Sequence, residues 1–158
     1  MLKKKEKKIN KIFSRLVQKK DQNQLLKWAN DISVRKASKR KKKISFIEHE
    51  KWFNKKLNNQ NSIMYIFCIK KKFVGQVRFD KVKNKNFISY SVDKKYRRKG
   101  YGKEILKKAI NKIKKQIKFK EVYAKVMKNN IASIKIFESL SFECYYKNHS
   151  YFFKKRIN

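Results

Sequence analysis

The stretch Arg97-Arg98-Lys99-Gly100-Tyr101-Gly102 holds two of the three glycines in this 158-residue chain. In a chain so poor in glycine, the residue stands where a positive φ or a close backbone approach excludes a side chain. Residues 86–93 before it have the composition of a β-strand. Residues 103–113 after it have apolar residues at helical spacing. A basic turn between a strand and a helix presents backbone N–H groups and the positive end of the helix dipole. The stretch therefore predicts a phosphate-binding turn; the plainer alternative is a tight turn with a glycine cap.

The segments on both sides of this turn predict alternating strands and helices in a single domain, residues 1–158. We expect strands at residues 11–17, 64–69, 73–79, 86–93, 121–127, 142–146 and 151–156, and helices at 21–28, 45–57, 103–113 and 132–140. Ser45 and Glu48 have the spacing of a capping box, and Phe46, Phe53 and Leu57 are expected on the inner face of that helix. Asp21 is expected to cap the first helix, and residues 33–43 to form a basic linker.

Composition excludes several classes of protein. No run of about 18 apolar residues is present, so a membrane-spanning helix is not expected. Residues 1–10 are charged and lack an apolar core, so they predict a flexible basic N-terminus and not a secretory signal. Cys68 and Cys144 lie in apolar runs without a CxxC pattern, which predicts buried thiols, no metal site and a cytoplasmic protein.

The formal charge of +36 does not by itself indicate a nucleic-acid partner. Only seven of the 47 basic residues are Arg, and the lysines are spread along the whole chain. Such a composition is typical of an AT-rich coding sequence. We interpret the charge mostly as a solvated surface, with nucleic-acid binding no stronger than non-specific attraction.

With this motif and element order, the chain resembles the GNAT acetyltransferase superfamily from about Lys11 to its end. Arg97, Gly100 and Gly102 match the family's Arg/Gln-x-x-Gly-x-Gly/Ala signature. About 30 residues downstream, Asn130-Ile-Ala-Ser133 matches a second family element at a helix start. The resemblance implies an α/β (α+β) fold. Its centre would be a mixed, mostly antiparallel, splayed sheet flanked by helices.

The resemblance also implies acetyl-CoA as co-substrate, with no metal. Backbone groups of the glycine turn would hold the pyrophosphate, Val92 would pair with the pantetheine arm or the acetyl carbonyl, and Asn130 would contact the cofactor. The residues implied in cofactor binding are Val92, Arg97, Arg98, Lys99, Gly100, Tyr101, Gly102, Lys103 and Asn130.

The first half of the chain contains Trp28-Ala-Asn30-Asp31, then Arg35 and Ser38, then His49-Glu-Lys-Trp52-Phe53. This arrangement resembles a narrower GNAT subgroup that acetylates the amino group of nucleotide-linked amino sugars, as in surface-glycan and flagellin sugar synthesis. Some of these relatives carry Arg where Ala29 stands here. The resemblance implies that Trp52 stacks on the base, with His49 and Arg78 near the phosphates or the sugar. The alternative for His49 and Trp52 is a core-edge histidine and a packing tryptophan. The implied acceptor-binding residues are Asn30, Arg35, Ser38, His49, Trp52 and Arg78.

Catalysis needs a base for the amine and a proton for the departing thiolate. His49 has the most suitable side chain for the base, and Asp80 is the second candidate. Many relatives place a Tyr at the position matched by Phe137, which cannot donate a proton. A phenol from Tyr90, Tyr145 or Tyr146, or water, would then take its place.

Three functions stay open on the sequence. The first is the amino-sugar N-acetyltransferase, acting by direct attack in a ternary complex on a small-molecule acceptor. The second is an N-acetyltransferase of a protein N-terminus or another small amine. The third is a non-catalytic basic protein associated with RNA, which would bind with a steep salt dependence. A homodimer is compatible with all three.

Overall fold

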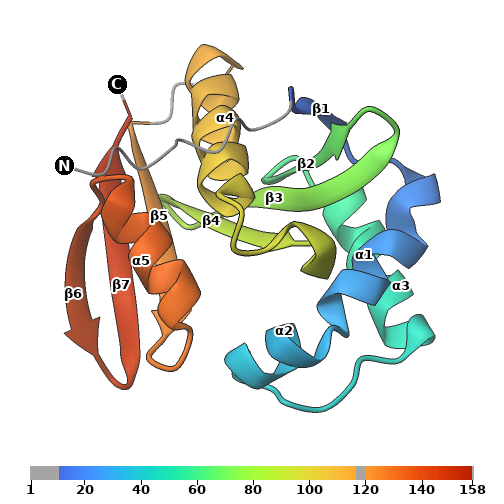
Figure 1. The fold of residues 1–158 in the computed structure, drawn as a ribbon, viewed down its shortest axis with the longest axis horizontal. Helices are drawn as coiled ribbons and strands as arrows, with labels where there is room; N and C mark the ends of the chain where they lie inside the picture. Colours follow the sequence, from blue (N-terminus) through green and yellow to red (C-terminus); the bar gives the residue numbers. More distant parts are fainter. Residues whose placement is uncertain (1–10, 117–119, 158) are drawn as a thin grey trace, which may run out of the picture.

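The computed structural model describes residues 11–116 and 120–157, which form one mixed sheet flanked by helices (Figure 1). The expected flexible N-terminus, residues 1–10, lies outside the described residues. The strands are β1 Phe13–Leu16, β2 Ser62–Ile69, β3 Lys72–Val82, β4 Lys85–Val92, β5 Glu121–Met127, β6 Glu143–Lys147 and β7 Ser150–Arg156. The helices are α1 Gln22–Ala29, α2 Ile32–Ala37, α3 Phe46–Leu57, α4 Tyr101–Gln116 and α5 Ile131–Ser139, with 3-10 turns η1 Lys19–Asp21 and η2 Lys94–Tyr96.

The strands are ordered β1-β2-β3-β4-β5-β7-β6. All neighbours are antiparallel except β4 and β5, which run parallel. Those two strands pair through a single register position, Phe87 with Tyr123, and diverge beyond it. The expected fold class, a mixed and mostly antiparallel sheet that splays at its centre, is confirmed.

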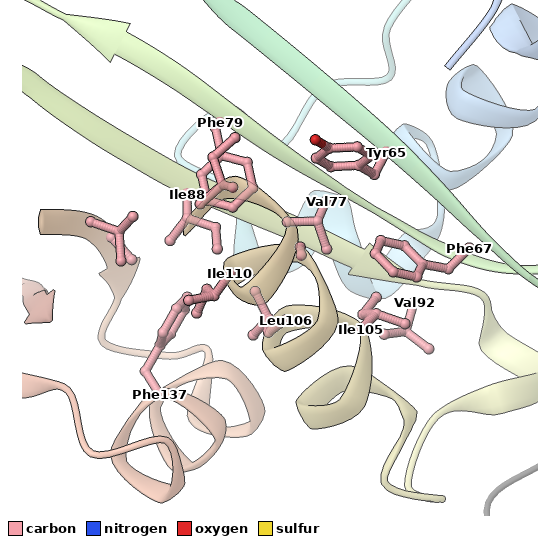
Figure 2. Close-up of a cluster of buried hydrophobic side chains, with 14 of the residues drawn as sticks. Tyr65, Phe67, Val77, Phe79, Ile88, Val92, Ile105, Leu106, Ile110 and Phe137 are labelled. Atoms are coloured by element: carbon pink, nitrogen blue, oxygen red, sulfur yellow. The ribbon is translucent and has the colours of Figure 1, made fainter. Parts of the chain in front are cut away.

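Both faces of the sheet are covered, and β2 explains why. Its alternate residues Tyr65 and Phe67 belong to the main core, while Met64 and Ile66 belong to a second cluster. The main core packs α4 and α5 against one face, with Leu106 and Ile110 beside Val77 and Phe137 (Figure 2). The second cluster packs Leu25, Trp28 and Phe53 of α1 and α3 against the other face. Successive side chains of a strand point to opposite faces, so a strand buried on both faces needs apolar residues in both alternating sets.

The expected linker at residues 33–43 is wrong in part, because α2 forms within it. The Asp31 carboxylate accepts hydrogen bonds from the backbone N–H groups of Ser33 and Val34, which caps this short helix. Helix α3 begins after Ser45, whose hydroxyl accepts from the N–H of Glu48, as expected. The inner face of α3 carries His49 and Phe53, whereas Phe46 is 50% exposed at the helix start.

Two further expectations need correction. Asp21 stands at the N-cap of α1, but its carboxylate makes no cap hydrogen bond there. It accepts instead from both terminal nitrogens of Arg15, at 2.6 and 2.8 Å, which ties β1 to α1. The thiol of Cys144 lies on the exposed edge strand β6 and is not buried, and Cys68 is half-buried. Within the described ranges, no helix is both long and apolar enough to cross a membrane.

Candidate active site

The turn between η2 and α4 has the backbone that the glycine pattern predicts. Gly100 has φ 87° and Arg98 has φ 58°, so two residues of the turn adopt the left-handed region. A Cβ at Gly102 would lie 2.8 Å from Cδ1 of Ile136 on α5. The first backbone N–H groups of α4 have no acceptor within the helix, and they lie at the end of this turn. Such a turn is suited to hold an anion against its backbone.

Three side chains of the turn serve to hold it in place. Arg97 donates from Nε to the Val92 carbonyl and from Nη1 to the Asp31 carboxylate, both at 2.9 Å. Lys99 folds back onto the carbonyl of Lys95 at 2.7 Å. The Tyr101 ring is buried in the main core. These contacts engage the three side chains within the fold, whereas no ion pair engages Arg98 or Lys103 among the described residues.

A second bond fixes the base of the turn. Asp93 caps η2 through the N–H of Lys95, and its other oxygen accepts from Nε1 of Trp28 at 2.8 Å. Trp28 is 3% exposed and is a core residue. Together with the Arg97–Asp31 ion pair, this hydrogen bond joins the turn to α1 and α2.

A cavity of about 610 Å³ opens in front of the turn. Its walls include Val92, Arg98, Gly100, Gly102, Lys103 and Asn130. Oδ1 of Asn130 accepts from the N–H of Ser133 at 3.2 Å, so the amide caps α5. The cavity therefore combines the splayed edge of β4, the turn and the start of α5.

Tyr90 also lines this cavity. Its hydroxyl is 3.0 Å from Oγ of Ser133, and its ring makes an edge contact with Phe137 at 6.0 Å. Burial raises the pKa of Tyr90, and the hydrogen bond with Ser133 offsets part of that rise. The other two candidate phenols, Tyr145 and Tyr146, are more than half exposed on β6 at the edge of the sheet. Of these three tyrosines, Tyr90 is the one that lines the cavity in front of the turn.

A second cavity of about 380 Å³ adjoins the first and shares Val34, Ser38, Tyr90 and Ser91 with it. Five of the six expected acceptor residues line it, and they come from three separate parts of the chain. Four of them are Arg35, His49, Trp52 and Arg78. Ser38 lines it too, and its hydroxyl donates to the Val34 carbonyl at 2.6 Å. Asn30 does not: its amide donates to and accepts from the Ile44 backbone, each at 2.8 Å, so it is a structural residue.

His49 is a buried polar residue on the wall of this second cavity. Its side chain is 3% exposed, and neither ring nitrogen has a hydrogen-bond partner among the described residues. The ring packs against Trp52 and Phe53, at centroid distances of 5.3 and 5.9 Å. Burial lowers the pKa of His49, which favours the neutral ring.

Asp80 is already fully engaged. Its carboxylate accepts from Lys56 at 2.7 Å, Ser62 at 2.6 Å and Arg78 at 2.6 Å. Burial alone would raise the pKa of Asp80, but the Arg78 charge and these hydrogen bonds outweigh burial and hold the pKa below its usual value. A stabilised carboxylate of this kind is a poor base, so the geometry argues against that expected role.

Trp52 is also partly engaged. The Arg78 guanidinium lies over its ring, 5.0 Å from the centroid, while Arg78 itself is paired with Asp80. One face of the indole is therefore covered by a neutralised arginine. A base that stacks on Trp52 would compete with this contact.

Sequence reasoning missed Asp31 and Trp28 as supports of the turn, and Ser133 as the partner of Tyr90. Ser133 belongs to the Asn130-Ile-Ala-Ser133 element, so its place near the site was predictable from the sequence. The partners of Asp31 and Trp28 are 66 and 65 residues away, and no local pattern indicates them. Among the described residues, no three His, Cys, Asp or Glu side chains gather to hold a metal ion.

Comparison with known proteins agrees with this geometry. The acetyltransferase (GNAT) domain model matches residues 12–143. No curated protein matches the sequence. A domain from Methanocaldococcus jannaschii has a TM-score of 0.83 at 22% identity, covering 94% of this chain and 99% of that one. An N-acetyltransferase from Staphylococcus aureus has a TM-score of 0.78 at 22% identity, covering 94% and 100%.

A third similar structure is a spermidine N-acetyltransferase from Vibrio cholerae in complex with CoA and spermine. Its TM-score is 0.76 at 13% identity, covering 90% of this chain and 92% of that one. At such identities, the structural likeness establishes the fold alone. The family model spans most of the described chain, including the glycine turn, the β4–β5 junction and the capping asparagine. The chain belongs to the GNAT family of acetyltransferases, whose fold uses acetyl-CoA.

Proposed function

We propose that this enzyme transfers the acetyl group of acetyl-CoA to the amino group of a nucleotide-linked amino sugar. The observation that carries the proposal is the pair of adjoining cavities, which share Val34, Ser38, Tyr90 and Ser91. Two ligands held in these cavities would meet at Tyr90. Such proximity converts a bimolecular acyl transfer into a reaction within one complex. We place the activity in the cytoplasm, because acetyl-CoA and activated sugars are metabolites of that compartment.

The larger cavity is assigned to acetyl-CoA. The backbone of residues 98–102 would hold the pyrophosphate, with Arg98 and Lys103 supplying positive charge. Val92 and Asn130 would contact the pantetheine arm along the splayed edge of β4. The positive φ of Gly100 fits a backbone that a ligand approaches closely. Gly102 is explained by packing, because a Cβ there would lie 2.8 Å from Cδ1 of Ile136.

The smaller cavity is assigned to the acceptor, and its charge favours an anion. Arg35 and Arg78 line it, and Glu48 is the one carboxylate among its lining residues. Glu48 is ion-paired with Arg40, so it offers little to a cationic acceptor. A polyamine, the substrate class named for the Vibrio cholerae neighbour, would meet uncompensated positive charge here. An acceptor that carries phosphates would be attracted.

The chemistry is assigned to two titratable groups: Tyr90, which lines both cavities, and His49, which lines the acceptor cavity. The amine nitrogen attacks the thioester carbonyl, the C–N bond forms, and the C–S bond breaks. We assign His49 to take the proton lost by nitrogen, because its ring is neutral and unpartnered. We assign Tyr90 to give a proton to the thiolate, and the Ser133 hydroxyl to orient it. Exchange with water returns both groups to their starting states.

Trp52 is assigned a packing contact with the sugar ring of the acceptor. Arg78 covers one face of the indole, which argues against a base stacked on that face. A rigid aromatic wall against a sugar buries apolar area at little entropic cost. Because Arg78 is neutralised by Asp80, its role is to hold Trp52 in place.

The test is a thiol-release assay with acetyl-CoA and a panel of acceptors. The panel contains UDP-linked amino sugars, the same sugars without nucleotide, spermidine, and peptides with free N-termini. We expect the highest kcat/KM for a UDP-linked amino sugar and a lower value for the free sugar. Preference for a peptide or for spermidine would overturn the proposed acceptor and leave the acetyltransferase assignment intact. Absence of thiol release with every acceptor, together with RNA binding, would favour a non-catalytic role.

A further inference from the structure

Carboxylates partner most of the arginines in this chain. Ion pairs join Arg15, Arg40, Arg78, Arg97 and Arg156 to Asp21, Glu48, Asp80, Asp31 and Glu121. Within residues 11–116 and 120–157, Arg98 and Arg35 have no such partner. Arg98 lies in the turn assigned to the cofactor's pyrophosphate. Arg35 has no ion-pair partner of its own, and the nearby Glu48 carboxylate is paired with Arg40.

Arg35 is half-buried, which makes the missing counter-charge significant. Its Nη1 donates to the carbonyl of Arg40 at 3.2 Å and its Nη2 to the hydroxyl of Ser38 at 3.2 Å. Both acceptors are neutral, and Nε is buried without a partner. Burial lowers the pKa of Arg35, the Arg40 charge lowers it further, and the Glu48 charge offsets part of this fall. A buried guanidinium with an unused donor is stabilised when an anion binds beside it.

A third cavity, of about 680 Å³, lies on the other side of this residue. Arg35 lines both this cavity and the acceptor cavity, so it stands between them. The new cavity also carries Lys36, Lys41 and Lys43, and its lining includes no carboxylate. Asn30 and Asn129 add neutral amides. Its charge is therefore entirely positive.

The backbone carbonyl of Lys36 is a shared acceptor in the wall of this cavity. The ammonium group of Lys41 donates to the carbonyl of Lys36. The amide of Asn129, at the entrance to α5, donates to the same carbonyl at 3.1 Å. These bonds connect the loop after α2 to the α5 side of the molecule, so the basic wall is part of the fold and not a loose tail.

We propose that this basic cavity binds the diphosphate of the acceptor, with Arg35 reaching it from the boundary with the acceptor cavity. The inference rests on the proposed function for the identity of the ligand. Arg78 is neutralised by Asp80, so the diphosphate leaves the acceptor cavity at its Arg35 end. The sugar then lies along Trp52, and the nucleoside lies beyond the lysines. Discrimination between activated and free sugars would come from this cavity.

The test uses calorimetry on the full chain with acetyl-CoA present at saturation, so that the cofactor turn is occupied. The probes are UDP and inorganic pyrophosphate. The variant Lys36→Gln/Lys43→Gln removes two charges from the cavity. The control Lys114→Gln/Lys115→Gln removes two charges from the last turn of α4, which lines none of these cavities. We expect the Kd of both probes to rise roughly tenfold in the first variant and less than about twofold in the control.

Two results would overturn the proposal. Equal weakening by both variants would mean that the overall charge of the chain attracts the probes. A comparable loss of acetyl-CoA affinity in the first variant, measured alone, would mean that the cavity holds a phosphate of the cofactor. Thermal melting of both variants checks their folding. If UDP binds with the expected lysine dependence but no UDP-linked sugar is acetylated, the cavity stands and the proposed acceptor fails.

Discussion

In the proposed mechanism the proton donor is Tyr90 on β4, and not a residue at position 137 on α5. Phe137 has no proton to give, but its ring packs edge-on against Tyr90 and supports it. Changing Tyr90→Phe removes one oxygen and keeps the packing. We expect kcat to fall at least about 100-fold, the scale of a lost general acid, with the Kd of acetyl-CoA nearly unchanged.

The measurement is a pH–rate profile of wild type, Tyr90→Phe and Ser133→Ala. The alkaline limb should disappear in Tyr90→Phe and shift in Ser133→Ala, because Ser133 tunes the phenol. Tyr145→Phe, on the exposed edge strand β6, is the matched control and should leave kcat unchanged. An unaltered profile in Tyr90→Phe would return the donor role to water.

His49 affects stability as well as chemistry. Burial lowers its pKa, so below about pH 6.5 the unfolded chain binds a proton more readily than the folded one. The contribution of the neutral ring is fully present above that pH and is lost as the pH falls. Urea unfolding at pH 7.5 and pH 5.5 should give a lower free energy of unfolding at the lower pH. His49→Phe should reduce this difference, and an identical pH dependence in the variant would contradict the account.

At the scale of elements, the cofactor turn depends on its backbone. Gly100 adopts φ 87°, which costs a residue with a side chain roughly 1–2 kcal/mol. Gly100→Val should lose acetyl-CoA affinity in calorimetry through both strain and obstruction. Gly100→Asn separates the two, because asparagine tolerates the left-handed region. Loss of affinity in both variants would indicate obstruction of the ligand, and equal affinity in wild type and Gly100→Val would reject the site.

Helix α2 connects the two ligand cavities through Asp31. One oxygen of Asp31 accepts from the N–H groups of Ser33 and Val34 and from Arg97 of the turn. Asp31→Ala should cost about 1–2 kcal/mol of stability, since it removes a cap and an ion pair. It should also weaken both acetyl-CoA and acceptor binding, measured by calorimetry and by KM. Glu121→Gln removes ion pairs at a distant strand and should leave both affinities unchanged.

Local patterns predicted most of these elements, and their failures have physical reasons. The strands were predictable because β2 carries apolar residues on both of its faces and β3 carries them at alternate positions on one face. Helix α2 was missed because six residues with little apolar periodicity give a weak signal. Phe46 was placed inside because it has the right spacing, but the first turn of α3 extends beyond the core.

The candidate site was predictable where a motif is local and not where it is assembled. The glycine turn and the cap at Asn130 are each contained in a few consecutive residues. The engagement of Asp80 by Lys56 and Ser62 joins residues 24 and 18 positions away. Only the folded sheet brings these groups together, so Asp80 could be proposed as a base until its partners were known.

At the scale of the whole molecule, the charge of +36 acts on any anionic substrate. A field of this size raises the local concentration of anions around the cavities. The KM of acetyl-CoA should therefore rise with ionic strength while kcat stays nearly constant. Steady-state assays from about 0.01 M to about 0.15 M NaCl cover a fall in Debye length from roughly 30 Å to roughly 8 Å. A KM independent of salt would mean that only contact charges matter.

The single pairing position between β4 and β5, Phe87 with Tyr123, leaves residues 88–92 and 124–127 without a ladder to each other. Alternate backbone amides in these two segments point into the gap between the strands and have no partner strand there. Their hydrogens should exchange rapidly with deuterated solvent, while the amides that β4 directs toward β3 exchange slowly. A ligand lying in the gap would slow the rapid set. Deuterium uptake along two short peptides would therefore report occupancy of the gap without any turnover.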